Sequence, residues 1–202
     1  MAKFQVLHNR ALNQMRDFFV SKIEATVQKI EEEKGRKGKK EGEKGGGMGG
    51  GGLEEGREEE FSLESSLYGR FRAISSQLSL LSKTIQQRTL NNFNNLQHNN
   101  LSNQTTPPPT STNYYVDSNS NNLNMEREKY SLLLEDLQQV YVGKRRQLVL
   151  PLLYHSIERI GKVSSGHLPT LVRSGSMEVV RMCSKEHSLF LHFFSHPSEP
   201  LQ

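Results

Sequence analysis

The sequence has no tryptophan, a single cysteine and no apolar run long enough to cross a membrane. Because Cys183 has no second cysteine to pair with, an internal disulfide is excluded, and a reducing compartment such as the cytosol is the simpler expectation. The longest apolar run, from Leu148 to Tyr154, has seven residues, whereas a membrane-spanning helix needs about 20. The N-terminus also lacks the apolar core of a secretory signal peptide. These absences argue against a disulfide-stabilised secreted domain and against an integral membrane protein.

Apolar side chains are also scarce, since hydrophobic residues make up 34% of the chain and aromatic residues 7%. Two tracts account for much of this scarcity. Residues 35–60 consist largely of Gly, Lys and Glu, and residues 91–124 contain 12 Asn together with Pro107-Pro108-Pro109. Such compositions cannot bury enough apolar surface to order a core, so both tracts are expected to be disordered low-complexity inserts.

The net charge of +4 is spread along the chain. The densest basic cluster, Lys144-Arg145-Arg146, contains only three residues. A nucleic-acid-binding protein usually carries a basic stripe with aromatic or motif support, and the sequence offers neither. No nucleic-acid partner is therefore expected, and a basic helical nucleic-acid-binding protein is kept only as the alternative function.

Residues 1–34 show the spacing of an amphipathic helix. Apolar residues recur every three or four positions, which places them on one stripe, and Gly35 is expected to end the helix. The residues of this stripe are Leu12, Met15, Phe19, Ile23, Val27 and Ile30.

Residues 61–90 show a heptad pattern over nearly three repeats. Two interpretations are open. The favoured one is core packing of one helix in a bundle, and the other is a helical hairpin or a seam with a partner helix. The candidate partner-helix interface consists of Leu67, Phe71, Ile74, Leu78, Leu81 and Ile85.

Residues 125–202 are expected to begin a helical rod. A helix is predicted to start near Asn124, a suitable N-cap, and Pro151 is expected to kink or end it. Its apolar face comprises Tyr130, Leu134, Leu137, Tyr141 and Leu148.

Another helix is predicted from Leu168, because Pro169 then falls in the first turn, and a further element is predicted from Ser184. Gly175 lies inside the helix and suggests close approach of a neighbouring helix. The apolar set expected to pack comprises Leu171, Val172, Val179, Val180 and Met182. No strand pattern occurs. The predicted fold class is therefore all-α, with elongated antiparallel or coiled-coil helices and a helical-rod segment, interrupted by the two inserts.

No constellation of residues indicates catalysis, a metal site or a cofactor. His192 and His196 lie four residues apart, but no Glu follows His192 as in a zinc protease. Cys183 has His187 four residues later, but nothing nearby would orient that histidine, so Cys183 is expected to act as a small buried hydrophobe. Arg173 is either an ion-pair partner, for example of Glu178, or a surface residue.

The C-terminal third carries a resemblance to a known family. Leu171-Val172-Arg173-Ser174-Gly175, followed by Cys183 and the run from Glu186 to Phe193-Phe194, resembles the central part of the family of subunit 3 of the conserved oligomeric Golgi complex, a vesicle tether. Similar segments lie at residues 4–31, 68–72 and 130–146, in the same order. Because family members are several times longer, the resemblance implies a fragment or truncated form.

The resemblance implies a non-enzymatic scaffold with no catalytic residues and no cofactor. It implies a helical rod held peripherally on the cytosolic face of Golgi membranes. The implied role is retrograde vesicle tethering within the Golgi, and hence Golgi organisation and glycosylation. The implied partners are other subunits of the complex, especially subunits 2 and 4, with membrane fusion proteins and small GTPases acting indirectly.

Overall fold

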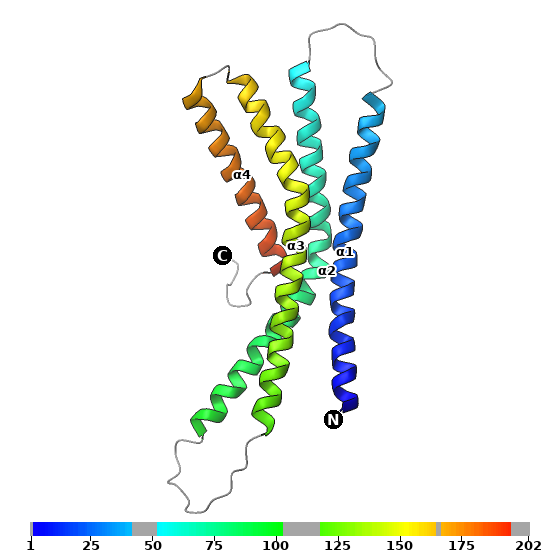
Figure 1. Cartoon of the computed structure of the whole chain (residues 1–202), viewed down its shortest axis with the longest axis vertical. Helices are drawn as coiled ribbons and strands as arrows, with labels where there is room; N and C mark the ends of the chain where they lie inside the picture. The colour runs from blue at the N-terminus through cyan, green and yellow to red at the C-terminus, as the bar shows by residue number, and fades with distance from the viewer. Residues whose placement is uncertain (1, 42–51, 103–117, 165–166, 195–202) are drawn as a thin grey trace, which may run out of the picture.

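The chain forms an elongated bundle of four α-helices. The computed structural model describes residues 2–41, 52–102, 118–164 and 167–194. The helices are α1 (Ala2–Glu41), α2 (Gly52–Ser102), α3 (Ser118–Val163) and α4 (Leu168–Phe194), and consecutive helices run antiparallel (Figure 1). No strand occurs within these described ranges. The predicted all-α fold with elongated antiparallel helices is confirmed.

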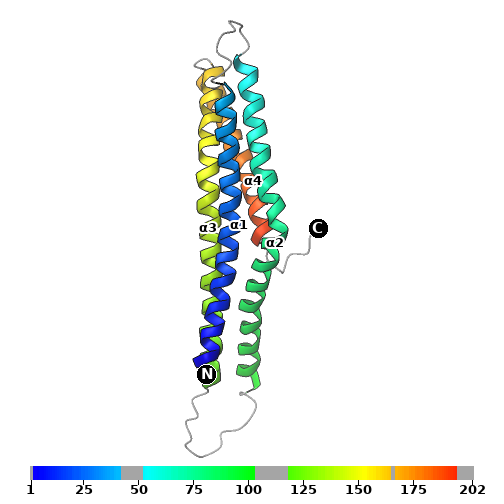
Figure 2. The same ribbon diagram turned by 90° about the vertical axis from the view of Figure 1, so that its right-hand side faces the viewer.

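The two central helices, α2 and α3, hold the bundle together. Each of them packs against the other three helices, whereas α1 and α4 lie on different sides of this pair (Figures 1 and 2). With 27 residues against 46, α4 accompanies only the C-terminal part of α3. The two outer helices meet near the end of α4, where the rings of Phe19 and Phe194 have centroids 5.9 Å apart.

The core is built from the apolar stripes that the sequence predicts for the first three helices. Leu12, Phe19, Ile23, Val27 and Ile30 are buried, and Met15 packs against the core. The predicted face of α3 is also in the core, with Leu137, Tyr141 and Leu148 fully buried.

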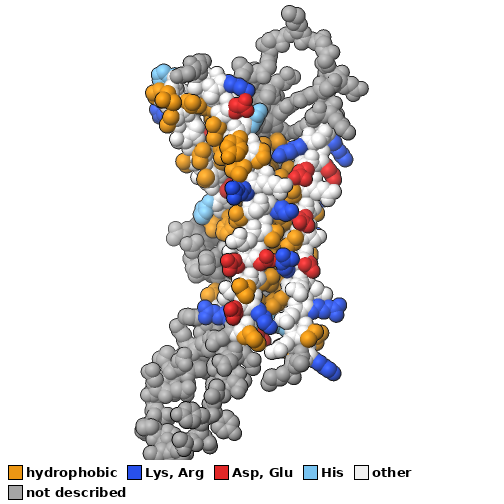
Figure 3. Space-filling model, in the orientation of Figure 1, with side chains coloured by type: hydrophobic (Ala, Val, Ile, Leu, Met, Phe, Trp, Pro, Cys, Tyr) orange, Lys and Arg blue, Asp and Glu red, His pale blue; other side chains and the backbone are white. Residues whose placement is uncertain are grey.

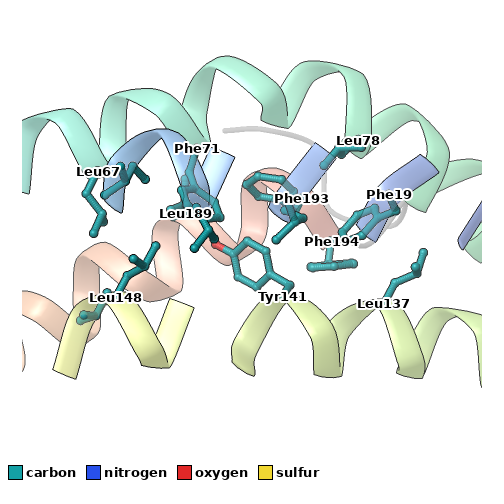
Figure 4. Close-up of a cluster of buried hydrophobic side chains, with 14 of the residues drawn as sticks. Phe19, Leu67, Phe71, Leu78, Leu137, Tyr141, Leu148, Leu189, Phe193 and Phe194 are labelled. Carbon is teal, nitrogen blue, oxygen red and sulfur yellow. The ribbon is translucent and has the colours of Figure 1, made fainter. Parts of the chain in front are cut away.

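An aromatic cluster joins all four helices at the level where α4 ends (Figure 4). Tyr141 of α3 lies at its centre, with its ring 4.8 Å from Phe193 and 6.1 Å from Phe71 between centroids. Phe19 of α1 and Phe194 of α4 complete it. Rings at such distances and tilted angles attract one another beyond the burial of their surface, so this cluster helps to hold the four helices together.

Two predicted helix boundaries are wrong. Gly35 does not end α1, which continues to Glu41, and Asn124 is not an N-cap, because α3 begins at Ser118. Lys, Arg and Glu around Gly35 favour helix, and one Gly costs only about 1 kcal/mol relative to Ala. The sequence before Asn124 contains no Pro after Pro109, so nothing blocks an earlier start of α3.

The chain also stays helical at two positions where the sequence indicates an interruption. Pro151 does not end α3, which continues to Val163, and the element predicted from Ser184 is the continuation of α4. Pro151 removes one backbone donor, but packing of α3 against three neighbours holds the helix on both sides of it.

Parts of both predicted inserts are helical. Helical structure covers residues 35–41 and 52–60 of the first tract, and residues 91–102 and 118–124 of the second. The central parts, residues 42–51 and 103–117, lie outside the described residues.

Gly175 does not mark a close helix approach, because a Cβ atom placed there would meet nothing within 4 Å. We therefore expect Gly175→Ala to raise the free energy of unfolding by about 1 kcal/mol through higher helix propensity. Chemical denaturation followed by circular dichroism measures this. A decrease in stability would show that a neighbouring group occupies the space.

Candidate helix-docking surface

The six heptad residues of α2 are used inside the bundle. Leu67, Phe71, Leu78 and Ile85 are fully buried, and Ile74 and Leu81 pack against the core. Their placement matches core packing, the favoured interpretation, and leaves little of their surface free for a partner in this conformation. A role as a partner-helix interface stays a prediction that would require the bundle to open.

The basic cluster of α3 is divided between the interior and the surface. Arg145 is 3% exposed, and its guanidinium donates hydrogen bonds to both carboxylate oxygens of Glu186 on α4. It also lies over the ring of Phe71, 4.5 Å from the centroid. Lys144 pairs with Glu24 of α1 at 3.2 Å, so only Arg146 remains exposed without a described ion pair. This division weakens the alternative of a nucleic-acid interface, which needs several exposed cations on one face.

A second charged network ties α4 to α2. Glu64 is buried and accepts hydrogen bonds from Arg181 and Lys185, at 2.8 Å and 2.7 Å. Burial raises the pKa of Glu64, but these hydrogen bonds and the two positive charges outweigh burial, and the net effect lowers it. The network therefore holds Glu64 ionised and fixes α4 against α2.

Glu178 belongs to the same network and does not pair with Arg173, which was one of the two alternatives open for that residue. Hydrogen bonds from Arg181 lower the pKa of the Glu178 carboxyl, and Ser156 of α3 also donates to it at 3.3 Å. Arg173 is exposed and forms no ion pair or hydrogen bond among the described residues. It is a surface residue, the other alternative that the sequence left open.

The segment that resembles the Golgi family is only partly buried. Phe193 and Phe194 are in the core, whereas Val172 is 57% exposed, and Leu171, Ser174 and Gly175 are half-buried. Cys183 is exposed, so its predicted role as a small buried hydrophobe is wrong. The buried stripe of α4 runs through Met182, and Cys183 lies about 100° further round the helix.

Several other apolar residues predicted to pack on α4 are also exposed, including Val179 at 37% and Val180 at 64%. Together with half-buried residues of α3 they form an apolar surface, which we call the α3–α4 outer face. Hydrophobic side chains gather over this part of the molecule (Figure 3). The outer face consists of Leu153, Ile157 and Ile160 of α3 and Leu168, Val172, Val179 and Val180 of α4.

The described residues show no arrangement typical of catalysis or metal binding. Among them, no three His, Cys, Asp or Glu side chains lie close enough to hold a metal ion. His187 and Cys183 are both exposed, and His192 lies 3.4 Å from Arg72 across to α2. His196 lies outside the described residues. No helix in the described ranges has the length and apolarity to span a membrane.

One open hollow of about 380 Å³ lies between α2 and α4, and Glu64, Tyr68, Arg72 and Lys185 are among the side chains that line it. Glu64 and Lys185 already pair with each other at 2.7 Å. The charges in this hollow therefore connect the helices and leave the outer face as the stronger candidate for binding.

The fold and this surface define an all-α helical-bundle protein, whose charged side chains pair across helices and whose outer face is apolar. Residues 64–202 match the family profile of conserved oligomeric Golgi complex subunit 3, C-terminal. The chain belongs to this family, and the resemblance noted in the sequence is confirmed.

Three curated relatives share this description. Conserved oligomeric Golgi complex subunit 3 of Mus musculus and that of Homo sapiens are each 32% identical over 73 residues, which is 36% of this chain and 9% of each relative. The subunit of Drosophila melanogaster is 35% identical over 66 residues, or 33% of this chain and 7% of the relative. The matched stretch thus spans less than a tenth of the length of these relatives. No solved structure matches the chain.

Proposed function

We propose that this chain is a non-enzymatic scaffold segment of a Golgi vesicle-tethering complex. Its role is retrograde transport within the Golgi, which supports Golgi organisation and the recycling of glycosylation enzymes. The observation that carries the proposal is the family match from residue 64 onwards, which includes most of α2 and all of α3 and α4.

The architecture supports this role. A tether needs to span distance and present helix faces to several partners, and an elongated bundle of helices with 27 to 51 residues provides both. Charged side chains inside the bundle pair across helices, as Arg145 does with Glu186, so they stiffen the structure. An apolar outer face then remains for association.

The proposed partners are other subunits of the complex, especially subunits 2 and 4. Membrane fusion proteins and small GTPases act indirectly, around the assembled complex. The chain is held on the cytosolic face of Golgi membranes through these protein contacts. Peripheral attachment accords with the lack of a membrane-spanning helix among the described residues.

The test is affinity purification of the tagged chain from cells, with mass spectrometry of the proteins that accompany it. We expect subunits 2 and 4 to be enriched at least tenfold over a tagged helical bundle of unrelated sequence. Absence of the complex from a soluble, helical chain would contradict the proposal. Leu78→Asp is unsuitable as a loss-of-binding variant, because Leu78 is fully buried and the change would unfold the bundle.

A further inference from the structure

The α3–α4 outer face lies on the side of the bundle that no other described helix covers. On α3, Arg145 and Ser156 turn towards α4, and Asp136 and Lys144 turn towards α1. At about 100° per residue, the stripe of Leu153, Ile157 and Ile160 lies beyond α4 and away from α1.

Two exposed valines of α4 lie beside this stripe of α3. Arg181 and Lys185 turn towards α2, and Glu186 turns towards α3. Val172 and Val179 lie on the other side of that α3-facing stripe, next to the apolar stripe of α3. Two neighbouring helices thus present adjacent apolar stripes, and such a pair of stripes can pack against the apolar face of a third helix.

The exposed charged residues that continue these stripes at heptad spacing are basic. Residues seven positions apart lie on the same face of a helix. Arg146 is seven residues before Leu153 on α3, and Arg173 is seven residues before Val180 on α4, so the two arginines border the exposed stripes. Both are exposed, as is His187, which lies seven residues after Val180. The acidic residues of α4, Glu178 and Glu186, already pair with Arg181 and Arg145.

We propose that the α3–α4 outer face binds an amphipathic helix from another protein, with an apolar stripe bordered by Asp and Glu. The carboxylates of that helix pair with Arg146 and Arg173 while its apolar stripe covers Val172, Val179 and Leu153. This inference deepens the proposed scaffold function, because it names the surface and the chemistry of one partner.

A second copy of the chain is a poorer occupant on electrostatic grounds. Two copies that associate through this face by two-fold symmetry would bring their Arg146 and Arg173 side chains to the same interface. Like charges that lose water at an interface repel one another and oppose association unless other groups compensate them. An acidic helix has the opposite charge and supplies that compensation.

The test uses the full chain and two synthetic peptides of about 18 residues, which span roughly 27 Å as helices. Both carry leucine at heptad positions a and d. One has glutamate at the bordering positions, and the matched control has lysine there. Fluorescence anisotropy measures binding. We expect the glutamate peptide to bind at least tenfold more tightly than the lysine peptide, and the difference to shrink as salt is added.

Variants of the chain locate the site. The double variant Val172→Glu with Val180→Glu should lower the affinity for the glutamate peptide at least tenfold. Leu80→Glu, at a 69% exposed position on α2, should leave this affinity unchanged. Arg146→Glu with Arg173→Glu should reverse the preference in favour of the lysine peptide. Circular dichroism of each variant verifies that the helices remain.

Three outcomes would overturn the inference. If the two peptides bind with equal affinity, Arg146 and Arg173 do not select an acidic helix. If Leu80→Glu weakens binding as much as the valine variant does, the peptide binds elsewhere on the bundle. If sedimentation shows that the chain forms a dimer, and Val172→Glu dissociates this dimer, the outer face binds a second copy of the chain. Each result is separate from recovery of the Golgi subunits in the purification above, which tests the scaffold function itself.

Discussion

Phe193→Ala is expected to lower the free energy of unfolding by about 4 kcal/mol, the largest effect of any single core substitution in α4. Phe193 is fully buried, and its ring lies 4.8 Å from that of Tyr141 and 6.4 Å from that of Phe71. Removing a buried ring costs its transfer from water and leaves a cavity, for a total of about 3–5 kcal/mol. Chemical denaturation monitored by circular dichroism measures the change.

The control for this prediction is Phe4→Ala, at a position that is 67% exposed near the start of α1. We expect it to change stability by less than about 0.5 kcal/mol, because the ring is already largely in water. An equally small effect for Phe193→Ala would show that the end of α4 does not pack on the aromatic cluster.

Glu186→Ala should destabilise the bundle by about 3 kcal/mol or more. The substitution leaves the guanidinium of Arg145 almost completely buried without its carboxylate, and among the described residues its Nη1 already has no hydrogen-bond partner. Loss of one member of a buried pair costs about 3–5 kcal/mol because the remaining charge is uncompensated. Thermal and chemical denaturation of the purified variant measure the loss.

A double variant distinguishes loss of the pair from loss of packing. Arg145→Met with Glu186→Leu removes both charges and keeps similar volumes, so we expect it to recover most of the lost stability. Glu158→Ala is the surface control, because it removes an exposed pair with Lys162 and should leave the stability nearly unchanged. A double variant as unstable as Glu186→Ala would contradict the role given to the buried charge.

The sequence predicted the core of the first three helices well, because helical periodicity directly shows which residues share a face. The stripe from Leu12 to Ile30 and the heptad stripe of α2 both lie in the core. The sequence did not show how many neighbours would cover each stripe. On α4, the residues Val172, Val179 and Val180 are as apolar as core residues, yet α2 and α3 cover only the adjacent stripe of Met182 and Leu189.

Helix boundaries and the polar contacts were harder to predict for a related reason. Gly35, Asn124 and Pro151 carry local signals for a helix end, but packing along neighbouring helices outweighs them. The pair of Arg145 and Glu186 joins residues 41 positions apart, so no local spacing could reveal it. Exposure of Cys183 likewise depends on which side of α4 meets the bundle.

The position of α1 has a consequence for how this family is divided into units. The family match begins at residue 64 and so leaves out α1, yet α1 packs against both α2 and α3 and contributes five buried apolar residues to the core. Arg16 also pairs with Asp136 of α3 at 2.6 Å. The unit that folds together is therefore larger than the unit that the family match delimits. A chain trimmed to residues 64–202 would expose a long apolar strip along α2 and α3 and would tend to aggregate.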